Sequence, residues 1–558
     1  MRNFHGSIFL LVFILASCSL EPEAESFAPQ PDLQTNETTG TSGMVSSAHP
    51  IATEAGLAIL RAGGNAFDSA VAVASMLNVV EPMMSGMGGY GTIMVYAAEA
   101  GSPLFLDASG KIPIGVNPDV YRAPTPNYME NRVGAKAVST PGAVHAWGAM
   151  HERYGTMDWS ELLQSAIQAA DMGYILDERI AQFIGMSFEA FSDYSKAIYG
   201  RDGQPLVEGD RLVQKDLANT LRLLADQGPA AIYTGALGQA IDKAMQSAGG
   251  FLAMVDLENH EAEWWTPLHL EYRGHTIYTP SAPAGAFPML ERLGMMDLLN
   301  SRNMGHNSLE YLHNFAEVTK MAYWDRLAYS GDPDVKPPPY ERLLSSAYWH
   351  SRNDTIDSEV AKDFDYSGIV TANSENTTHF VVADRFGNIV SAQVTLGGLF
   401  GSKIMPEGTG FWLNNSLRYC TFEPAGNPMD AHPGRRKLSS DAPSIIFKDG
   451  RPVVAIGTPG GHTITQTVSQ MIMNLLDFEM GIEEAIAAPR IAFIEPNILA
   501  VDETVPQFVR EQLAGMGHEI QVRDLGNANG LTIDYLDDGS VRFTGASDPR
   551  GAGLAKGF

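Results

Sequence analysis

The chain has 558 residues, with 65 acidic and 37 basic side chains and a formal net charge of −28 at pH 7. Binding to phosphates needs clustered Lys and Arg, so this charge balance argues against nucleic acid as a partner. Two cysteines exclude a disulfide scaffold and a cysteine-based zinc site. The apolar fraction of 44% and the charged fraction of 18% are typical of a globular protein with a sizeable core.

The first 17 residues have the features of an export signal. Arg2 is followed by the apolar run Ile8–Ala16, which is too short to span a bilayer of about 30 Å. The run ends Leu15-Ala16-Ser17-Cys18, which resembles a bacterial lipoprotein signal with the lipid on Cys18. An ordinary secretory signal that contains a cysteine is the alternative. We expect an exported protein, lipid-anchored on the periplasmic side of the bacterial cell envelope, and Ser19 favours the outer membrane.

Residues 18–43 are rich in Pro, Glu, Ser and Thr and contain few large apolar side chains. Such a segment cannot bury enough surface to offset its ordering entropy, so we expect a flexible leash. The folded body is then expected to begin at Met44. The sequence contains no second apolar run of membrane-spanning length, so the lipid would be its only membrane contact.

The first half of the body reads mainly as helices. Pro50–Leu60 has helical apolar spacing and ends at Gly63-Gly64, and a second helix is predicted through Val71–Leu77. The glycine cluster Ser85–Gly91 precedes a strand-like run and lacks the Gly-Lys-Ser/Thr ending of a P-loop, which indicates close backbone packing. Helical patterns also cover Asp158–Met172 and Leu309–Tyr329.

The last third contains two hairpin signals. Thr378–Ala383 and Ile389–Thr395 are β-rich runs on either side of a turn, and an Asp-Gly turn at Asp449-Gly450 marks the second hairpin. After Gly460-Gly461 the apolar spacing becomes helical. Strands and helices in both halves predict an α+β protein whose sheets are covered by helices.

Blocks along the whole body together resemble the γ-glutamyltranspeptidase family, and they occur in the family's order. This resemblance implies an N-terminal-nucleophile hydrolase with an αββα sandwich. The blocks are Met44–Tyr96, Ala316–Asp334, Thr377–Leu396, Arg436–Ser440, Gly457–Gly461, Glu483–Arg490 and Gly545–Arg550.

The resemblance also implies that the chain is a precursor that cuts itself between Asn376 and Thr377. A large subunit, residues 44–376, and a small subunit, residues 377–558, would then build the sandwich together as a heterodimer. A threonine hydroxyl is a poor nucleophile unless a base lies beside it, and an N-terminal threonine carries its own base, the free α-amine. That amine, with a pKa near 8, is partly neutral at working pH, whereas in the precursor the same nitrogen is an amide. Cleavage is therefore expected to activate Thr377.

Further site residues are carried over from the family motifs. Thr395 matches the threonine that hydrogen-bonds the nucleophile, and Gly460 and Gly461 match the pair whose N–H groups form the oxyanion hole. Ser439 and Ser440 match substrate contacts. Each has a plain structural alternative as a strand or turn residue. We expect no cofactor and no metal site, because the 14 histidines show no His-Glu-x-x-His spacing.

The chain departs from the family where the γ-glutamyl head group is held. Ser109 stands where an arginine is expected to bind the α-carboxylate, and Tyr419 stands where an acidic residue is expected to bind the α-amine. Losing two hydrogen bonds to charged groups costs roughly 3–6 kcal/mol. Lys111 or Arg418 is a candidate replacement for the missing arginine.

Three functions remain open from the sequence. The first is a self-processing γ-glutamyltransferase or glutathione hydrolase that passes an acyl group from Thr377 to water or an amine. The second keeps this chemistry but uses a non-glutamyl donor, as a cephalosporin acylase does. The third is an uncleaved lipoprotein that serves as a binding scaffold. Inner against outer membrane also remains open.

Overall fold

The computed structural model describes residues 37–122, 130–363 and 376–558. The export signal, Cys18 and most of the expected leash therefore lie outside the described residues. No helix in the described part of the chain is both long and apolar enough to cross a membrane.

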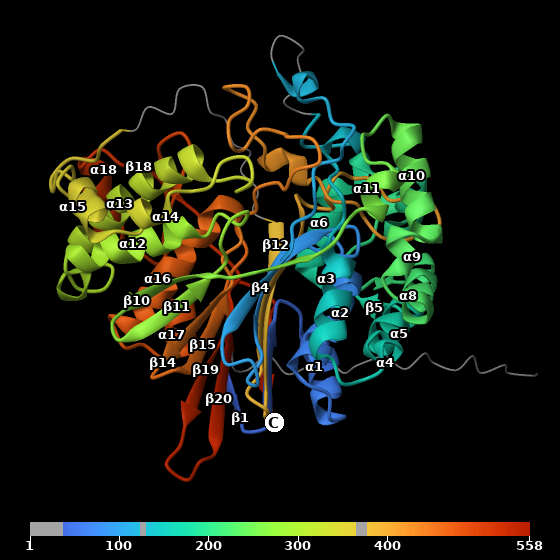
Figure 1. The fold of residues 1–558 in the computed structure, drawn as a ribbon, viewed down its shortest axis with the longest axis horizontal. Helices are drawn as coiled ribbons and strands as arrows, with labels where there is room; N and C mark the ends of the chain where they lie inside the picture. Colours follow the sequence, from blue (N-terminus) through green and yellow to red (C-terminus); the bar gives the residue numbers. More distant parts are fainter. Residues whose placement is uncertain (1–36, 123–129, 364–375) are drawn as a thin grey trace, which may run out of the picture.

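Two seven-stranded sheets face each other at the centre of the molecule (Figure 1). In spatial order the first sheet contains β1 (Glu37–Gly40), β20 (Val541–Ser547), β19 (Asn529–Tyr535), β15 (Arg451–Gly457), β14 (Ser444–Lys448), β11 (His275–Thr279) and β10 (Leu268–Tyr272). The second contains β21 (Leu554–Gly557), β2 (Gly43–Ser47), β12 (Asn376–Asp384), β13 (Ile389–Gly397), β3 (Tyr90–Tyr96), β4 (Pro103–Ala108) and β9 (Glu263–Trp265).

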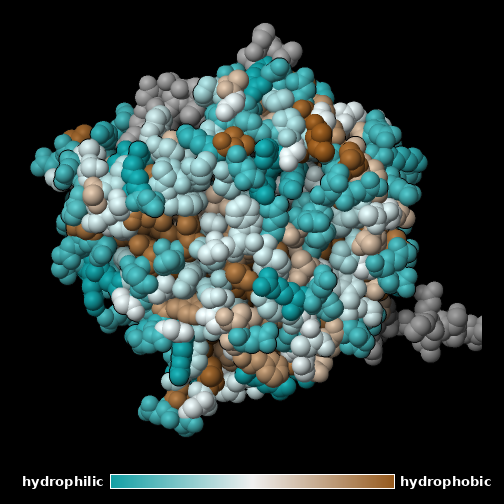
Figure 2. Space-filling model, viewed as in Figure 1, coloured by the Kyte–Doolittle hydropathy of each residue, from teal (hydrophilic) through white to brown (hydrophobic). Residues whose placement is uncertain are grey.

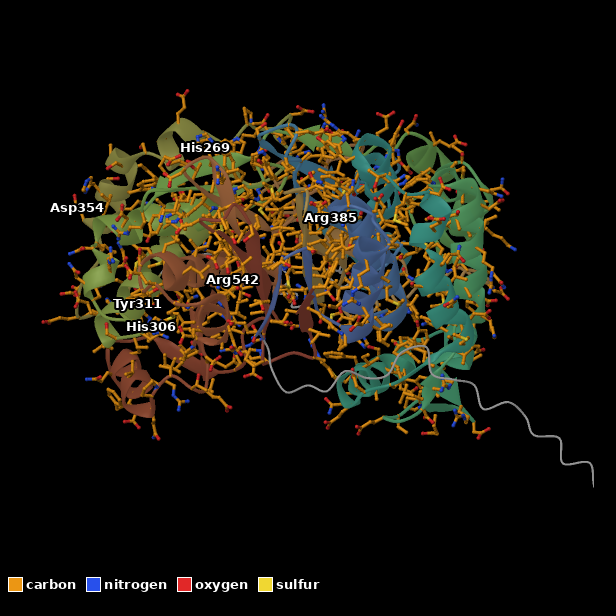
Figure 3. All side chains as sticks on the ribbon, turned by 90° about the horizontal axis from the view of Figure 1, so that it is seen from below. His269, His306, Tyr311, Asp354, Arg385 and Arg542 are labelled. Carbon is orange, nitrogen blue, oxygen red and sulfur yellow. The ribbon has the colours of Figure 1, made fainter. Side chains whose placement is uncertain are left out.

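The core between the two sheets is formed by alternate side chains of their strands. Phe105 and Val381 on one sheet and Ile445 and Leu531 on the other belong to this buried cluster. Period-two burial of this kind follows from the pleat of a β-strand, which points successive side chains to opposite faces. Viewed from below, Arg385 in the β12–β13 turn and Arg542 on β20 mark the two sheets (Figure 3).

Helices cover the outer face of each sheet, so the architecture is the expected αββα sandwich of the α+β class (Figure 1). On the side of the second sheet lie α1 (Pro50–Arg61), α2 (Ala66–Val80), α3 (Ala143–Tyr154), α4 (Trp159–Leu162), α5 (Gln164–Met172), α6 (Glu178–Ser187), α7 (Asp193–Tyr199), α8 (Lys215–Gln227), α9 (Ala230–Tyr233), α10 (Ala236–Ala248) and α11 (Met254–Glu258). On the side of the first sheet lie α12 (Phe287–Leu298), α13 (Leu309–Tyr329), α14 (Tyr340–Leu343), α15 (Ser346–Asn353), α16 (Ile464–Leu476), α17 (Ile482–Ala487) and α18 (Gln507–Gly515).

Three smaller sheets complete the described part of the fold. β16 (Ile491–Ile494), β17 (Ile498–Val501) and β18 (Glu519–Val522) form a three-stranded sheet, and β5 (Tyr174–Ile175) with β8 (Arg211–Leu212) and β6 (Gly200–Arg201) with β7 (Gln204–Pro205) form two short pairs. The face drawn in Figure 2 is mainly hydrophilic, in keeping with the net charge of −28.

Two expectations about local structure need correction. The folded body includes Glu37–Gly40, which the sequence had placed in the leash, because β1 pairs with β20 from Glu37↔Ala546 to Gly40↔Phe543. The order of β1 comes from the backbone hydrogen bonds that β20 supplies. The polar composition of β1 therefore did not predict that it is ordered. The helix expected over Asp158–Met172 is two helices, α4 and α5, with Leu163 between them.

Candidate active site

Thr377 is the second residue of β12, and its hydroxyl lies against β13. It is buried, with 5% of its surface exposed, and its Oγ1 donates to Oγ1 of Thr395 at 3.2 Å. The pairing of β12 with β13 shifts register between Asn376 and Thr378. Such an irregularity re-aims a side chain relative to the regular pleat. The two threonines singled out from the sequence are therefore in contact.

Thr395 also contacts the peptide bond that precedes Thr377. Its Oγ1 donates to the carbonyl oxygen of Asn376 at 2.8 Å and accepts from the N–H of Gly397 at 2.8 Å. A chain of hydrogen bonds therefore runs from the Thr377 hydroxyl through Thr395 to the carbonyl of the Asn376–Thr377 bond. This geometry polarises the carbonyl group beside the candidate nucleophile.

The next two residues of β12 are held by buried polar partners. Thr378 donates to Glu81 at 2.8 Å, and burial raises the pKa of Glu81. His379 is fully buried, its Nε2 lies 3.0 Å from the Ser391 hydroxyl, and burial lowers its pKa to about 3. His379 is therefore neutral and packs inside the sheet, in line with a structural role.

Gly460 and Gly461 form the turn that leads from β15 into α16. Their φ angles are +141° and +60°, values that non-glycine residues rarely adopt. The N–H groups of both glycines lack an acceptor among the residues that the structure describes. Free N–H groups in front of a helix can bind an anionic oxygen.

A cavity of about 190 Å³ joins this turn to the threonine. Thr377 and Gly460 both line it, so a tetrahedral intermediate on Thr377 would face the glycine turn. The remaining lining residues are Met84, Arg179, Phe183, Asn376, Pro459, Thr463 and Arg523–Asn527.

Ser439 and Ser440 occupy a buried polar layer behind β3 and β13. The Ser439 hydroxyl bonds to the carboxylate of Asp441, which also accepts from Thr92 at 3.1 Å. Ser440 accepts a hydrogen bond from Arg326 at 2.9 Å. Neither serine is among the residues that line the cavity at Thr377.

Lys437 is a charged group in this layer that the sequence analysis missed. Its Nζ lies 3.5 Å from the centre of the Tyr90 ring, and burial lowers its pKa to about 8. Asp441 and Asp107 act in the opposite direction on that pKa. Burial raises the pKa of Asp107 to about 6.

The positions expected to hold a glutamyl head group carry little charge. Ser109 is fully buried and its N–H donates to Asp107, and Tyr419 is buried with its phenol bonded to Tyr90. Lys111 forms an ion pair with Glu263 at 3.4 Å and is partly exposed. Arg418 instead lies close to the site, because a Cβ placed on Gly398 would be 2.3 Å from its Nη1.

One group of buried side chains in the described residues has the composition of a metal site. His313, Glu317 and His518 converge within 4.8 Å. Lys320 already donates to Glu317 at 2.8 Å, and His518 and His313 bond to each other at 2.9 Å. A divalent cation would lie beside a buried ammonium group with one carboxylate to balance both, so this group is better explained as a hydrogen-bonded cluster.

Comparisons with known proteins find relatives over nearly the whole chain. The gamma-glutamyltranspeptidase family model matches residues 52–558. The chain is 33% identical to the glutathione hydrolase proenzyme of Bacillus subtilis strain 168, over 98% of this chain and 97% of that protein. It is 36% identical to the acylase ACY 1 proenzyme of Pseudomonas sp. strain V22, over 91% and 92%.

Solved structures show the same two kinds of relative. The cephalosporin acylase from Bacillus halodurans superposes with a TM-score of 0.84 at 26% identity, over 97% of this chain and 99% of that one. The Helicobacter pylori gamma-glutamyltranspeptidase chain gives a TM-score of 0.55 at 32% identity, over 57% and 92%.

Proposed function

Because the chain belongs to the γ-glutamyltranspeptidase family of N-terminal-nucleophile hydrolases, we propose that it is a self-processing enzyme that cleaves amides through an acyl-Thr377 intermediate. The observation that carries the proposal is the hydrogen-bond chain from Thr377 through Thr395 to the Asn376 carbonyl. Its relatives include proteins named proenzymes, which supports activation by cleavage.

The geometry suggests how the precursor cuts itself. The Thr377 oxygen attacks the Asn376 carbonyl carbon while its proton passes to Thr395, and Thr395 gives its own proton to the carbonyl oxygen. Collapse of this intermediate breaks the C–N bond, protonates the Thr377 nitrogen and leaves an ester. Water hydrolyses the ester and yields the Asn376 carboxylate and a free Thr377 amine.

The mature enzyme would use the same atoms on its substrate. The Thr377 α-amine accepts the hydroxyl proton, the oxygen attacks the substrate amide, and the N–H groups of Gly460 and Gly461 stabilise the oxyanion. The amine half of the substrate leaves with a proton. Water or an amine acceptor then releases the acyl group from Thr377.

Two donor classes are candidates. A γ-glutamyl donor such as glutathione fits the relatives named glutathione hydrolase. A non-glutamyl donor fits the acylase relatives, and the uncharged Ser109 and Tyr419 at the head-group positions favour it. We further propose export, lipid attachment at Cys18 and a heterodimer of the two fragments, on the evidence of the N-terminal sequence and the proenzyme relatives.

The decisive experiment is the intact mass of protein that begins at Ser19, beside its Thr377→Ala and Thr377→Ser variants. We expect the parent and the serine variant to give two fragments, the smaller beginning at residue 377, and the alanine variant to stay whole. An alanine variant that splits at this bond would refute the nucleophile assignment. A parent that stays whole under all conditions would support the scaffold alternative.

A further inference from the structure

Tyr90 on β3 lies beside Thr395, the hydrogen-bond partner of the proposed nucleophile. The two residues pair directly across β3 and β13, and directly paired residues point their side chains to the same face of a sheet. The Tyr90 hydroxyl lies 3.4 Å from the position that a Cβ on Gly397 would take, and Gly397 pairs with Asn376. The Tyr90 ring therefore forms a wall of the site next to the bond that Thr377 is proposed to cut.

Two buried neighbours hold the Tyr90 ring in place. Lys437 Nζ lies 3.5 Å from the centre of this ring and 6.0 Å from the centre of the Tyr419 ring. The phenol groups of Tyr90 and Tyr419 share a hydrogen bond. All three side chains are buried, and an ammonium group packs strongly on an aromatic face where water is excluded. The ring is accordingly held by contacts that a ligand would have to break to move it.

The charge of Lys437 is balanced inside the protein. The carboxylates of Asp441 and Asp107 both raise the pKa of the Lys437 ammonium, against the larger effect of burial. Asp441 also accepts hydrogen bonds from Ser439 and Thr92. An ammonium group that already has internal counter-charges gains little from a charged substrate group. Lys437 is therefore better suited to support the Tyr90 ring than to bind an anion.

This cluster fills the place where the family resemblance puts the charged head group of a glutamyl donor. Ser109 and Tyr419 stand at the two positions expected to hold that head group, and both are buried. Tyr90, Tyr419 and Lys437 are not among the residues that line the cavity at Thr377. The chain's own side chains therefore close this side of the site.

We propose that Tyr90, held by Lys437 and Tyr419, limits the length of the acyl group that Thr377 accepts. The donor class is an amide of a short, uncharged carboxylic acid, from acetyl to butyryl. A longer acyl chain would have to displace a packed ring, and a γ-glutamyl group would bring two further charges into a buried site. This inference rests on the proposed function and specifies its donor.

The test compares four p-nitroanilides on the purified, processed enzyme: acetyl, butyryl, hexanoyl and γ-glutamyl. We expect kcat/KM for the hexanoyl and γ-glutamyl compounds to be lower than for butyryl by about tenfold or more, because a closed pocket rejects added methylene groups and unpaired charges. A parent enzyme that hydrolyses hexanoyl as well as butyryl, or that prefers γ-glutamyl, would overturn the proposal.

Two variants of one residue form a matched pair. Tyr90→Val removes the ring and keeps a side chain that suits a strand, so it should raise kcat/KM for hexanoyl relative to butyryl by about tenfold or more. Tyr90→Phe keeps the ring without its hydroxyl and should keep the parent's ratio. Equal ratios in Tyr90→Val and the parent would show that the ring does not set the limit.

A second measurement requires no turnover. Reductive methylation with formaldehyde modifies accessible amines, and peptide mapping then gives the modified fraction of each lysine. Lys437 should stay unmodified in the parent and in Tyr90→Phe and become reactive in Tyr90→Val, whereas Lys215, whose side chain is 66% exposed, should be modified in all three. Modification of Lys437 in the parent to the extent of Lys215 would show an open pocket and overturn the proposal.

The two measurements separate this inference from the proposed function. A processed enzyme that hydrolyses none of the four anilides, with Lys437 protected from methylation, would count against the Thr377 mechanism and leave the closed pocket standing. Turnover that is independent of acyl length would leave the Thr377 mechanism standing and refute the limit that Tyr90 is proposed to set.

Discussion

Thr395 makes three hydrogen bonds that join the proposed nucleophile to the peptide bond before it. It accepts from Thr377 and from the Gly397 N–H, and it donates to the Asn376 carbonyl. A valine or alanine at this position would leave the strand in place but break the connection between nucleophile and scissile carbonyl.

We expect Thr395→Ala to slow self-cleavage about 10²- to 10³-fold, the loss typical of removing one donor to a reacting carbonyl oxygen. Thr395→Ser keeps the hydroxyl and should cleave within a few-fold of the parent. The rate at which the 377–558 fragment accumulates after synthesis measures both. Cleavage of the alanine variant at the parent's rate would reduce Thr395 to a structural residue.

The buried His379 makes the free energy of unfolding depend on pH. Its folded pKa of about 3 lies below the unfolded value of 6.5, so between these values the unfolded chain binds a proton that the folded chain does not. Its contribution to stability is complete above about pH 6.5 and declines by about 1.4 kcal/mol for each unit of lower pH.

His379→Gln should therefore show a shallower fall in unfolding temperature than the parent between pH 7 and pH 5. Glutamine retains a group that can hydrogen-bond to Ser391, and it does not titrate in this range. Between pH 7 and pH 5 the parent should lose about 2 kcal/mol more of its free energy of unfolding than the variant loses. Calorimetry at pH 7, 6 and 5 tests it, and parallel curves for the two proteins would contradict it.

At the scale of elements, helix α13 carries the buried ion pair Lys320–Glu317. This pair is neither a metal site nor, by itself, evidence that the fold is stable. Lys320 on this helix donates to Glu317 and to the backbone carbonyl of Lys362. Near the start of the same helix Tyr311 lies 6.5 Å from His306, ring centre to ring centre (Figure 3).

Lys320→Met should destabilise the protein by about 3–5 kcal/mol, because it leaves the Glu317 carboxylate buried without a counter-charge. The double variant Glu317→Gln with Lys320→Met should lose less. Arg302→Gln breaks an exposed pair and should cost under about 1 kcal/mol. Unfolding temperatures rank the three, and a double variant less stable than Lys320→Met would contradict the argument.

Sequence patterns predicted the long elements because their signals are local. Helix α13 spans the predicted residues Leu309–Tyr329, and the β12–β13 hairpin follows from two β-rich runs around a turn. β1 was missed because its order depends on β20, about 500 residues away. The split at Leu163 was missed because the apolar spacing of Asp158–Met172 is continuous there.

In the candidate site too, residues in local motifs could be predicted from the sequence, whereas contacts between distant segments could not. The motif residues Thr377, Thr395 and Gly460 could be named from the sequence, and the structure places them around one cavity or in contact. Arg132 carries no motif, and its backbone carbonyl accepts a hydrogen bond from Asn415, 283 residues further along the chain. Contacts between distant segments leave no periodic signal, so this contact required the structure.

At the scale of the whole molecule, the proposed cut would not divide the fold. The first sheet takes β1, β10 and β11 from the residues before the proposed cut, and its other four strands from the residues after it. The second sheet places β12, β13 and β21 of the small fragment beside strands of the large one. Both sheets therefore contain strands of both fragments.

The cleaved protein is accordingly expected to remain one particle. Breaking the Asn376–Thr377 bond removes no strand pairing, and the buried cluster between the sheets draws on both fragments. Size-exclusion chromatography in native buffer should give a single peak that resolves into two bands on a denaturing gel, and urea should unfold both fragments in one transition. Residues 377–558 eluting as a separate folded species would show that the sandwich is divisible. The uncleaved Thr377→Ala protein, which should elute at the same volume, is the matched control.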